Sequence, residues 1–159
     1  MRLRRRLAPA AVLLAACIQE PTIPTVAEAP IALTMAFSTK AFRVGKADTI
    51  SVTATSTFTA PARLLFATDC QIQLTIRSAR GAAVVPPGGR PTCSGAASAL
   101  LIPAKGTVTQ RFVWTGLDQV LPTASTTTVA PGTYYVSAAI NATNYSTVAP
   151  AVKVDLLAR

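Results

Sequence analysis

A strict alternation of apolar and polar residues in two separate segments constrains the fold of this chain more than any other feature. In Thr49–Thr57 the apolar positions alternate with threonine and serine, and in Cys70–Arg77 they alternate with glutamine, threonine and arginine. Successive side chains of a strand point to opposite faces, so this period of two predicts antiparallel strands with one buried face. The residues predicted to face inward are Ile50, Val52, Ala54, Cys70, Ile72, Leu74 and Ile76.

Further short segments rich in β-branched and apolar residues predict additional strands, with proline- and glycine-containing turns between them. No later segment shows the apolar stripe of a helix. Together they predict an all-β fold, an antiparallel β-sandwich of about seven to nine strands. In residues 107–114 we expect the inward face to hold Val108, Gln110, Phe112 and Trp114, and the alternative is the opposite face with Thr107 and Val113. The additional strands are expected at residues 31–37, 63–66, 82–85, 99–102, 107–114, 133–140 and 148–157.

Four segments of the chain together resemble one known domain. They are Leu64–Gly81, Leu101–Gly106, Phe112–Trp114 and Val129–Val136, and the last contains the run Pro-Gly-Thr-Tyr-Tyr-Val. Their pattern is similar to that of the BsuPI-type intracellular proteinase inhibitor domain, over residues 45–142. The resemblance implies that the sandwich is immunoglobulin-like. As an activity, it implies inhibition of a proteinase.

The first residues of the chain have the pattern of an export signal. A basic start with four arginines is followed by the apolar run Leu7–Ala16, which is about ten residues long where a membrane-spanning helix needs roughly 20. The run ends in Leu14-Ala15-Ala16-Cys17, which resembles the lipobox of bacterial lipoproteins. That resemblance implies cleavage before Cys17 and a diacylglycerol on its sulfur. The alternatives are an ordinary signal peptide with a different cleavage site and a buried N-terminal helix.

The segment after the signal is predicted to be a tether. Pro21, Pro24 and Pro30 prevent a regular helix or central strand, and an extended tether of this length reaches up to roughly 40 Å. We therefore divide the chain into a signal peptide (residues 1–16), a Pro-rich tether (17–30) and a β-sandwich domain (31–159). Residue 18 is isoleucine, whereas an aspartate there commonly retains Gram-negative lipoproteins at the inner membrane. The expected location is the outer membrane, facing the periplasm, if the source is Gram-negative.

The cysteines fit an exported protein. If Cys17 carries lipid, Cys70 and Cys93 are left as a pair, and disulfides persist outside the cytoplasm. A bridge between them closes a loop of about 24 residues, which stabilises the fold by roughly 3–4 kcal/mol in the chain-entropy description. The alternative is two free buried thiols.

The charge pattern gives no reason to expect nucleic acid as a partner. The chain has 15 basic and 6 acidic residues, and four of the basic ones lie in the signal. The remaining cations are scattered singly, without the basic stripe and interleaved aromatics of nucleic-acid-binding domains.

The sequence lacks the residues on which most catalytic and metal sites depend. It has no histidine, which excludes Ser-His-Asp and Cys-His catalysis and most zinc, copper and non-haem iron sites. The acidic residues are few and widely spaced in the sequence, so no calcium loop or carboxylate pair is expected. We therefore predict no catalytic residues, no metal site and no cofactor.

Two asparagines begin sequons for N-glycosylation. They are Asn141-Ala-Thr143 and Asn144-Tyr-Ser146. In a bacterial lipoprotein we interpret them as ordinary loop asparagines.

These patterns lead to three hypotheses of function. The first is a non-catalytic, lipid-anchored module that binds or scaffolds a protein partner in the cell envelope. The second is a proteinase inhibitor, in which Arg80–Cys93 forms a Pro-stiffened loop strapped by the disulfide and offers Arg80 or Arg90 to a trypsin-like proteinase. A plain surface hairpin is the alternative for that loop. Two features depart from the pattern of the BsuPI-type inhibitor domain, namely the cysteine at position 70 and the length of the loop that contains Cys93. The third hypothesis is an enzyme with an atypical site.

Overall fold

The computed structural model describes residues 30–89, 93–123 and 125–159, and this part of the chain contains 11 strands and no helix. The strands are β1 (Ile31–Phe37), β2 (Ala41–Arg43), β3 (Asp48–Ser56), β4 (Ala62–Phe66), β5 (Gln73–Ser78), β6 (Ala83–Val85), β7 (Ser98–Ile102), β8 (Thr107–Trp114), β9 (Gly132–Ala142), β10 (Tyr145–Val148) and β11 (Val152–Leu157).

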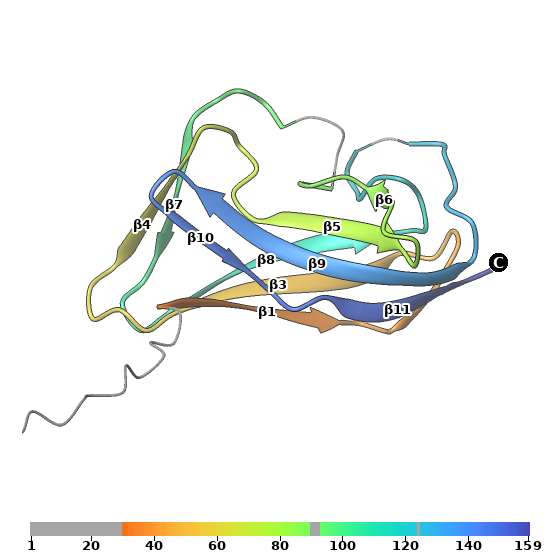
Figure 1. Cartoon of the computed structure of the whole chain (residues 1–159), viewed down its shortest axis with the longest axis horizontal. Coiled ribbons are helices and arrows are strands. Elements are labelled where there is room, and N and C mark those ends of the chain that lie inside the picture. Colours follow the sequence, from red (N-terminus) through yellow and green to blue (C-terminus); the bar gives the residue numbers. More distant parts are fainter. Residues whose placement is uncertain (1–29, 90–92, 124) are drawn as a thin grey trace, which may run out of the picture.

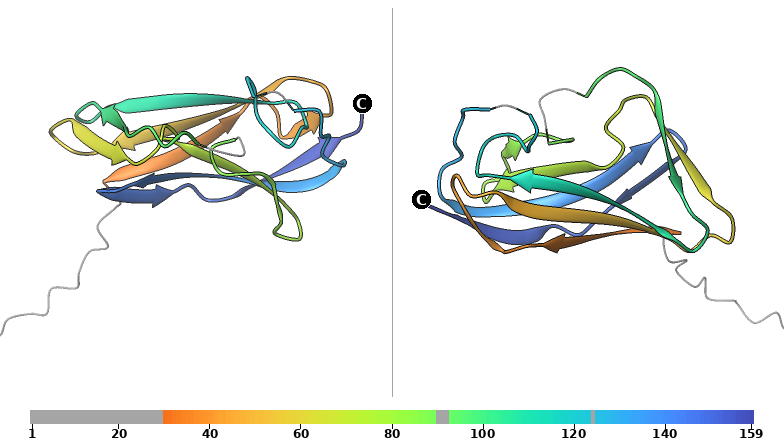
Figure 2. Two further views of the ribbon diagram at one scale, coloured as in Figure 1. Left: turned by 90° about the horizontal axis from the view of Figure 1, so that it is seen from above. Right: turned by 180° about the vertical axis from the view of Figure 1, so that it is seen from behind.

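The strands build a sandwich, whose two layers are seen edge-on in the left view of Figure 2. One sheet has the order β1-β3-β8, and the other has the order β2-β11-β9-β5-β6, with β10 paired to β9. The strands β4 and β7 form a separate antiparallel ribbon, which we call the arm. The arm lies across the end of the sandwich at which β1 begins (Figure 1). The predicted all-β sandwich is confirmed.

The alternation in the sequence predicts the core faces correctly. Every residue expected inward in the two alternating segments is buried, although β5 starts three residues later than expected. In β8, Phe112 and Trp114 are buried as predicted, but Gln110 is exposed. The prediction for Gln110 was wrong because β8 is an edge strand, and Gln110 lies at an open hollow beside Pro122.

Two features of the second sheet differ from the predicted antiparallel pattern. The strand expected at residues 148–157 is β11, which begins at Val152, and the strand β10, which ends at Val148, was not predicted. Both pair with β9 and are separated around Pro150. The short strand β2 was not predicted, and it pairs in parallel with β11. The two unpredicted strands, β2 and β10, raise the number of strands above the seven to nine expected.

Trp114 lies at the centre of an aromatic cluster between the sheets. Its ring centroid is 5.3 Å from that of Phe42 and 6.1 Å from that of Tyr134, and its indole N–H donates to the carbonyl of Leu117 at 2.6 Å. The Tyr134 hydroxyl donates to the carbonyl of Ala130, four residues upstream. This is the tyrosine corner of immunoglobulin-like sandwiches. Burial raises the pKa of the Tyr134 phenol above its usual value.

The core belongs to one continuous region of the chain. All buried members of the hydrophobic cluster lie between Ile31 and Leu156. Within the described residues, positions 31–156 therefore supply one continuous hydrophobic core.

Candidate functional site

Two of the site residues expected from the sequence, Cys17 and Arg90, lie outside the described residues. The described part of the chain contains no helix long and apolar enough to cross a membrane. The other expected site residues, Cys70, Cys93 and Arg80, are all described.

Cys70 and Cys93 form a disulfide, with their Cα atoms 5.7 Å apart. Cys70 is buried three residues before the core strand β5, and the segment around Cys93 is held to the segment before β5 by side chains. The N–H of Ser94 donates to Oδ1 of Asp69 at 2.8 Å, and the hydroxyl of Ser98 donates to the carbonyl of Thr68 at 2.6 Å. The expected bridge is therefore present and joins the loop after β6 to the core.

Two glycines let the loop after β6 pack directly on the disulfide and on Val120. A Cβ atom on Gly88 would lie 2.7 Å from Sγ of Cys70, and one on Gly89 would lie 2.2 Å from Cγ2 of Val120. Both glycines have positive φ, +86° and +74°, a region that side-chain-bearing residues rarely adopt. The carbonyl of Gly89 also accepts the N–H of Val120 at 2.9 Å. This part of the loop is built for close packing.

Arg80 lies on a different element from the disulfide loop. It is exposed in the turn between β5 and β6, which is closed by hydrogen bonds from Gly81 N–H to the Ser78 carbonyl at 2.9 Å and from Arg77 Nη1 to the Gly81 carbonyl at 3.1 Å. The strand β6, expected at residues 82–85, pairs with β5 and separates the turn at Arg80 from the segment at Cys93.

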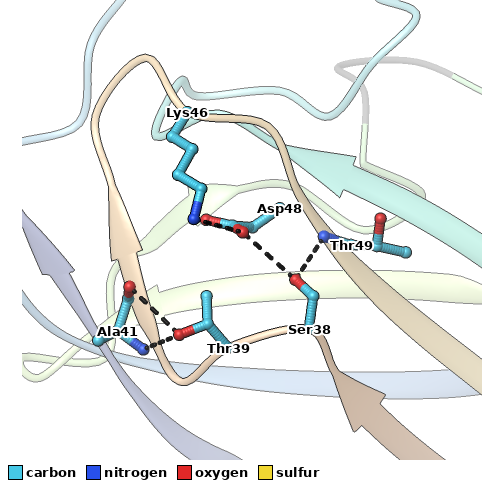
Figure 3. Close-up of polar contacts among 6 residues, drawn as sticks. All are labelled: Ser38, Thr39, Ala41, Lys46, Asp48 and Thr49. Atoms are coloured by element: carbon cyan, nitrogen blue, oxygen red, sulfur yellow. Dashed lines mark hydrogen bonds and ion pairs between the residues drawn. The ribbon is translucent and has the colours of Figure 1, made fainter.

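The buried acidic residue Asp48 anchors a polar cluster between β1 and β3 (Figure 3). Its Oδ1 accepts a hydrogen bond from the Ser38 hydroxyl at 3.4 Å and forms an ion pair with Nζ of Lys46 at 3.6 Å. The same Ser38 hydroxyl accepts the N–H of Thr49 at 3.0 Å. The second carboxylate oxygen of Asp48 has no partner among the described residues. The cluster fixes the chain where it leaves β1.

The other described carboxylates also bind nearby hydroxyl or main-chain groups. Asp118 accepts from the hydroxyl of Ser125, and Asp155 accepts from that of Thr133 at 2.8 Å. The possible ligand atoms of Asp69, Cys70 and Cys93 all lie within 4.8 Å of one another. Both sulfurs are held in the disulfide, so neither is available as the thiolate that a metal requires.

The turn between β9 and β10 fastens the arm to the sandwich. Oδ1 of Asn144 accepts the N–H of Leu65 at 3.0 Å, and its Nδ2 donates to the carbonyl of Arg63 at 2.9 Å. The N–H of Thr143 donates to the carbonyl of Leu65 at 2.7 Å. The amide of Asn144 thus pairs with β4 as a neighbouring strand would. Asn144 lies in a turn, as interpreted from the sequence, whereas Asn141 lies in the strand β9 and not in a loop.

The outer face of the arm exposes apolar side chains. Alternation along both strands buries one face, and the opposite face carries Arg63 directly across from Leu101 and Leu65 directly across from Ala99. Leu101 is 61% exposed and Leu65 is 41% exposed. Contiguous exposed apolar side chains of this kind mark interaction surfaces more often than scattered ones do.

The loops at the tip of the arm lie where the described chain begins. The N–H of Thr57 donates to the carbonyl of Pro30 at 2.9 Å, and the N–H of Lys105 donates to the carbonyl of Phe58 at 2.8 Å. Phe58 is 42% exposed. The hydroxyl of Tyr145 binds both the N–H and the carbonyl of Ile31, each at 3.2 Å. The entry of the chain into the sandwich is therefore held firmly at this end.

Comparisons with known proteins do not assign a family. No family model matches the chain, and no curated protein matches it. Solved structures match in part, and three of them illustrate the likeness. A Pseudomonas fluorescens alkylpurine DNA glycosylase bound to abasic-site DNA has 18% identity and a TM-score of 0.48, over 82% of this chain and 31% of that one. The CARDB domain of a Pyrococcus furiosus protein in complex with di-metal ions has 10% identity and a TM-score of 0.48, over 80% and 87%.

The third is a β-glucosidase from Erythrobacter marinus, with 13% identity and a TM-score of 0.47 over 80% of this chain and 15% of that one. The chain thus spans about a third of the glycosylase and a much smaller part of the glucosidase. The assignment of the fold rests on the strands themselves.

Proposed function

We propose that this chain is a non-catalytic module of the cell envelope, anchored by lipid on Cys17, that binds an extended segment of a partner protein along the open edge of β8. The lipobox and the Pro-rich segment support the anchor. The edge of β8 is the observation that carries the binding part of the proposal.

The edge of β8 offers main-chain groups without partners. The carbonyl of Val113 accepts the N–H of Leu121 at 2.9 Å on the side away from β3. Because alternate residues of an antiparallel strand direct their main-chain groups to opposite sides, Thr109 and Arg111 direct theirs to the same side as Val113. Within the described residues, the N–H and C=O groups of Thr109 and Arg111 have no hydrogen-bond partner. Such an edge accepts an added strand.

A hollow beside this edge suits a side chain of the added strand. It has a volume of about 230 Å³, and its lining combines Gln110 and Phe112 of β8 with Cys70, Gly88 and Leu121. Main-chain hydrogen bonds along an edge give affinity, and hollows for alternate side chains give selectivity. Cys70 of the disulfide and Gly88 therefore form part of the wall of the proposed site.

A proline on the edge tests strand addition. The variant Thr109→Pro removes an outward N–H and leaves the β3–β8 ladder intact, since proline is tolerated on an edge strand. The matched control Thr109→Val also loses the hydroxyl bond to Thr53 but keeps the N–H. Envelope proteins captured by the wild-type chain should be lost with Thr109→Pro and kept with Thr109→Val, by quantitative mass spectrometry. Equal capture by all three forms would reject the β8 edge as the site.

The anchor is tested separately. The wild-type chain expressed in a Gram-negative host should yield a mature form that starts at Cys17 with diacylglycerol attached, as measured by intact-protein mass spectrometry. The variant Cys17→Ser should not receive lipid. A mature N-terminus at another residue would reject the lipobox interpretation.

Proteinase inhibition is the second candidate, and the exposed turn at Arg80 supports it. A turn closed by its own hydrogen bonds loses little conformational entropy when it binds. The purified chain should then slow trypsin at micromolar concentration, and Arg80→Ala should remove the effect. Failure of the wild-type chain to slow either trypsin or subtilisin would reject this candidate.

A further inference from the structure

We infer that the end of the sandwich at which the described chain begins is a docking surface for anionic phospholipid headgroups. The surface, which we call the anchor-end surface, consists of the outer face of the arm and its tip: Phe58, Arg63, Leu65, Ala99, Leu101 and Lys105. The inference extends the proposed function, because it states how the anchored domain lies on the membrane.

The charges of this surface suit an anionic partner. Arg63 and Lys105 are both exposed. The four acidic residues that the structure describes are Asp48, Asp69, Asp118 and Asp155, and none belongs to the outer face of the arm or to the loops at its tip. Each cation close to an anionic membrane contributes about a fivefold gain in binding.

The apolar side chains of the surface suit the headgroup region. Leu101 and Arg63 face each other across the arm, and Phe58 lies beside Lys105 through the main-chain bond between them. Apolar and aromatic side chains next to cations are the composition of surfaces that lie in the membrane interface. An exposed face made only of cations would bind by charge alone.

The position of the surface favours a membrane over a protein as the occupant. Pro30, the last residue of the tether predicted from the sequence, is bound to Thr57 at the tip of the arm. A lipid on Cys17 would bring this end of the domain, rather than the end at which β2 and β11 pair, toward the bilayer (Figure 1). The tether then keeps the surface at a high local concentration of headgroups.

The test uses the chain from residue 17 with Cys17→Ser, so that no lipid contributes to binding. Among the described residues the core spans positions 31–156, and circular dichroism checks the fold of each variant. The partition coefficient is measured by sedimentation with two kinds of vesicle. One contains phosphatidylcholine alone, and the other contains phosphatidylcholine and phosphatidylglycerol in equal amounts. Binding to the anionic vesicles is expected, and Arg63→Gln/Lys105→Gln should weaken it by about 25-fold. Leu101→Ser should weaken it by about threefold or more.

The matched control places the same change of charge at the other end of the sandwich. Lys40→Gln/Arg43→Gln removes two exposed cations at β2 and should change the partition coefficient by less than about twofold. Equal weakening by both double variants would overturn the inference, because binding would then follow net charge alone. Failure to bind either kind of vesicle would also overturn the inference. So would a hydrogen-exchange experiment in which an envelope protein protects the amides of the arm and the vesicles do not. Because the chain carries no lipid, these outcomes are independent of the test of Cys17.

Discussion

Asn144 pairs with the main chain of Leu65 as if it were part of an adjacent strand. Its side-chain oxygen accepts the Leu65 N–H at 3.0 Å, while its amide nitrogen donates to the carbonyl of Arg63 two residues earlier. One side chain thus satisfies two main-chain groups on the edge of β4. The relationship fixes the arm, and with it the anchor-end surface, relative to the sandwich.

Replacing Asn144 with alanine should loosen the arm. The change removes two hydrogen bonds, and each contributes about 1 kcal/mol or less at an exposed edge. We expect a loss of about 1 kcal/mol in the free energy of unfolding in urea, with faster amide exchange at Leu65. Asn141→Ala is the control, because the Asn141 side chain binds Gln73 within the sandwich and leaves the arm untouched. Unchanged exchange at Leu65 in Asn144→Ala would contradict the proposed role.

The sequence predicts those parts of the fold that depend on a regular pattern. The strands β1 and β8 begin and end as expected, and the inward positions of β3 and β5 are correct, because burial of one sheet face requires a period of two. The strand β2 is three residues long, which is too short to show a period. Its parallel pairing with β11 depends on contacts between distant segments.

The candidate sites are less accessible to sequence analysis for a related reason. The disulfide was predicted because a cysteine pair and export point to the same chemistry. The role of Asn144 depends on a strand about eighty residues away, and no local pattern reports it. The exposure of Leu101 could not be predicted either. A short apolar strand has the same sequence pattern whether one of its faces or both faces pack against other parts of the protein.

Removal of the disulfide should destabilise the domain strongly. The bridge spans 23 positions between Cys70 and Cys93, and loss of this constraint on the unfolded chain costs roughly 3 kcal/mol. Urea unfolding of Cys70→Ala/Cys93→Ala should show this decrease, and a reducing agent should affect only the wild-type chain. A decrease of equal size in both proteins on reduction would show that the agent acts elsewhere.

Alanine at Gly89 should cost more than alanine at Gly81. Both glycines have positive φ, +74° and +86°, so each substitution carries the backbone strain of about 1–2 kcal/mol. A Cβ on Gly81 meets nothing within 4 Å, whereas one on Gly89 lies 2.2 Å from Cγ2 of Val120. Overpacking therefore adds about 1–3 kcal/mol at Gly89 but not at Gly81. This cost is measured as the difference in unfolding free energy between Gly89→Ala and Gly81→Ala. The second variant Val120→Ala should recover part of that difference, and equal costs at both glycines would contradict the contact.

The tyrosine corner should make the domain sensitive to alkaline pH. Burial raises the pKa of Tyr134 above its ordinary value of 10.0, so the folded state holds the phenolic proton more tightly than the unfolded state does. The resulting stability is complete below the ordinary pKa and is lost as pH rises through the raised value. Tyr134→Phe should cost about 1 kcal/mol at neutral pH, because the hydrogen bond to Ala130 is lost. Its unfolding free energy should fall less steeply above pH 10 than that of the wild-type chain. If the unfolding free energies of the two proteins fall in parallel above neutral pH, Tyr134 is not the group responsible. Tyr135→Phe is the control for the loss of any tyrosine, because Tyr135 lies at an exposed position of the same strand.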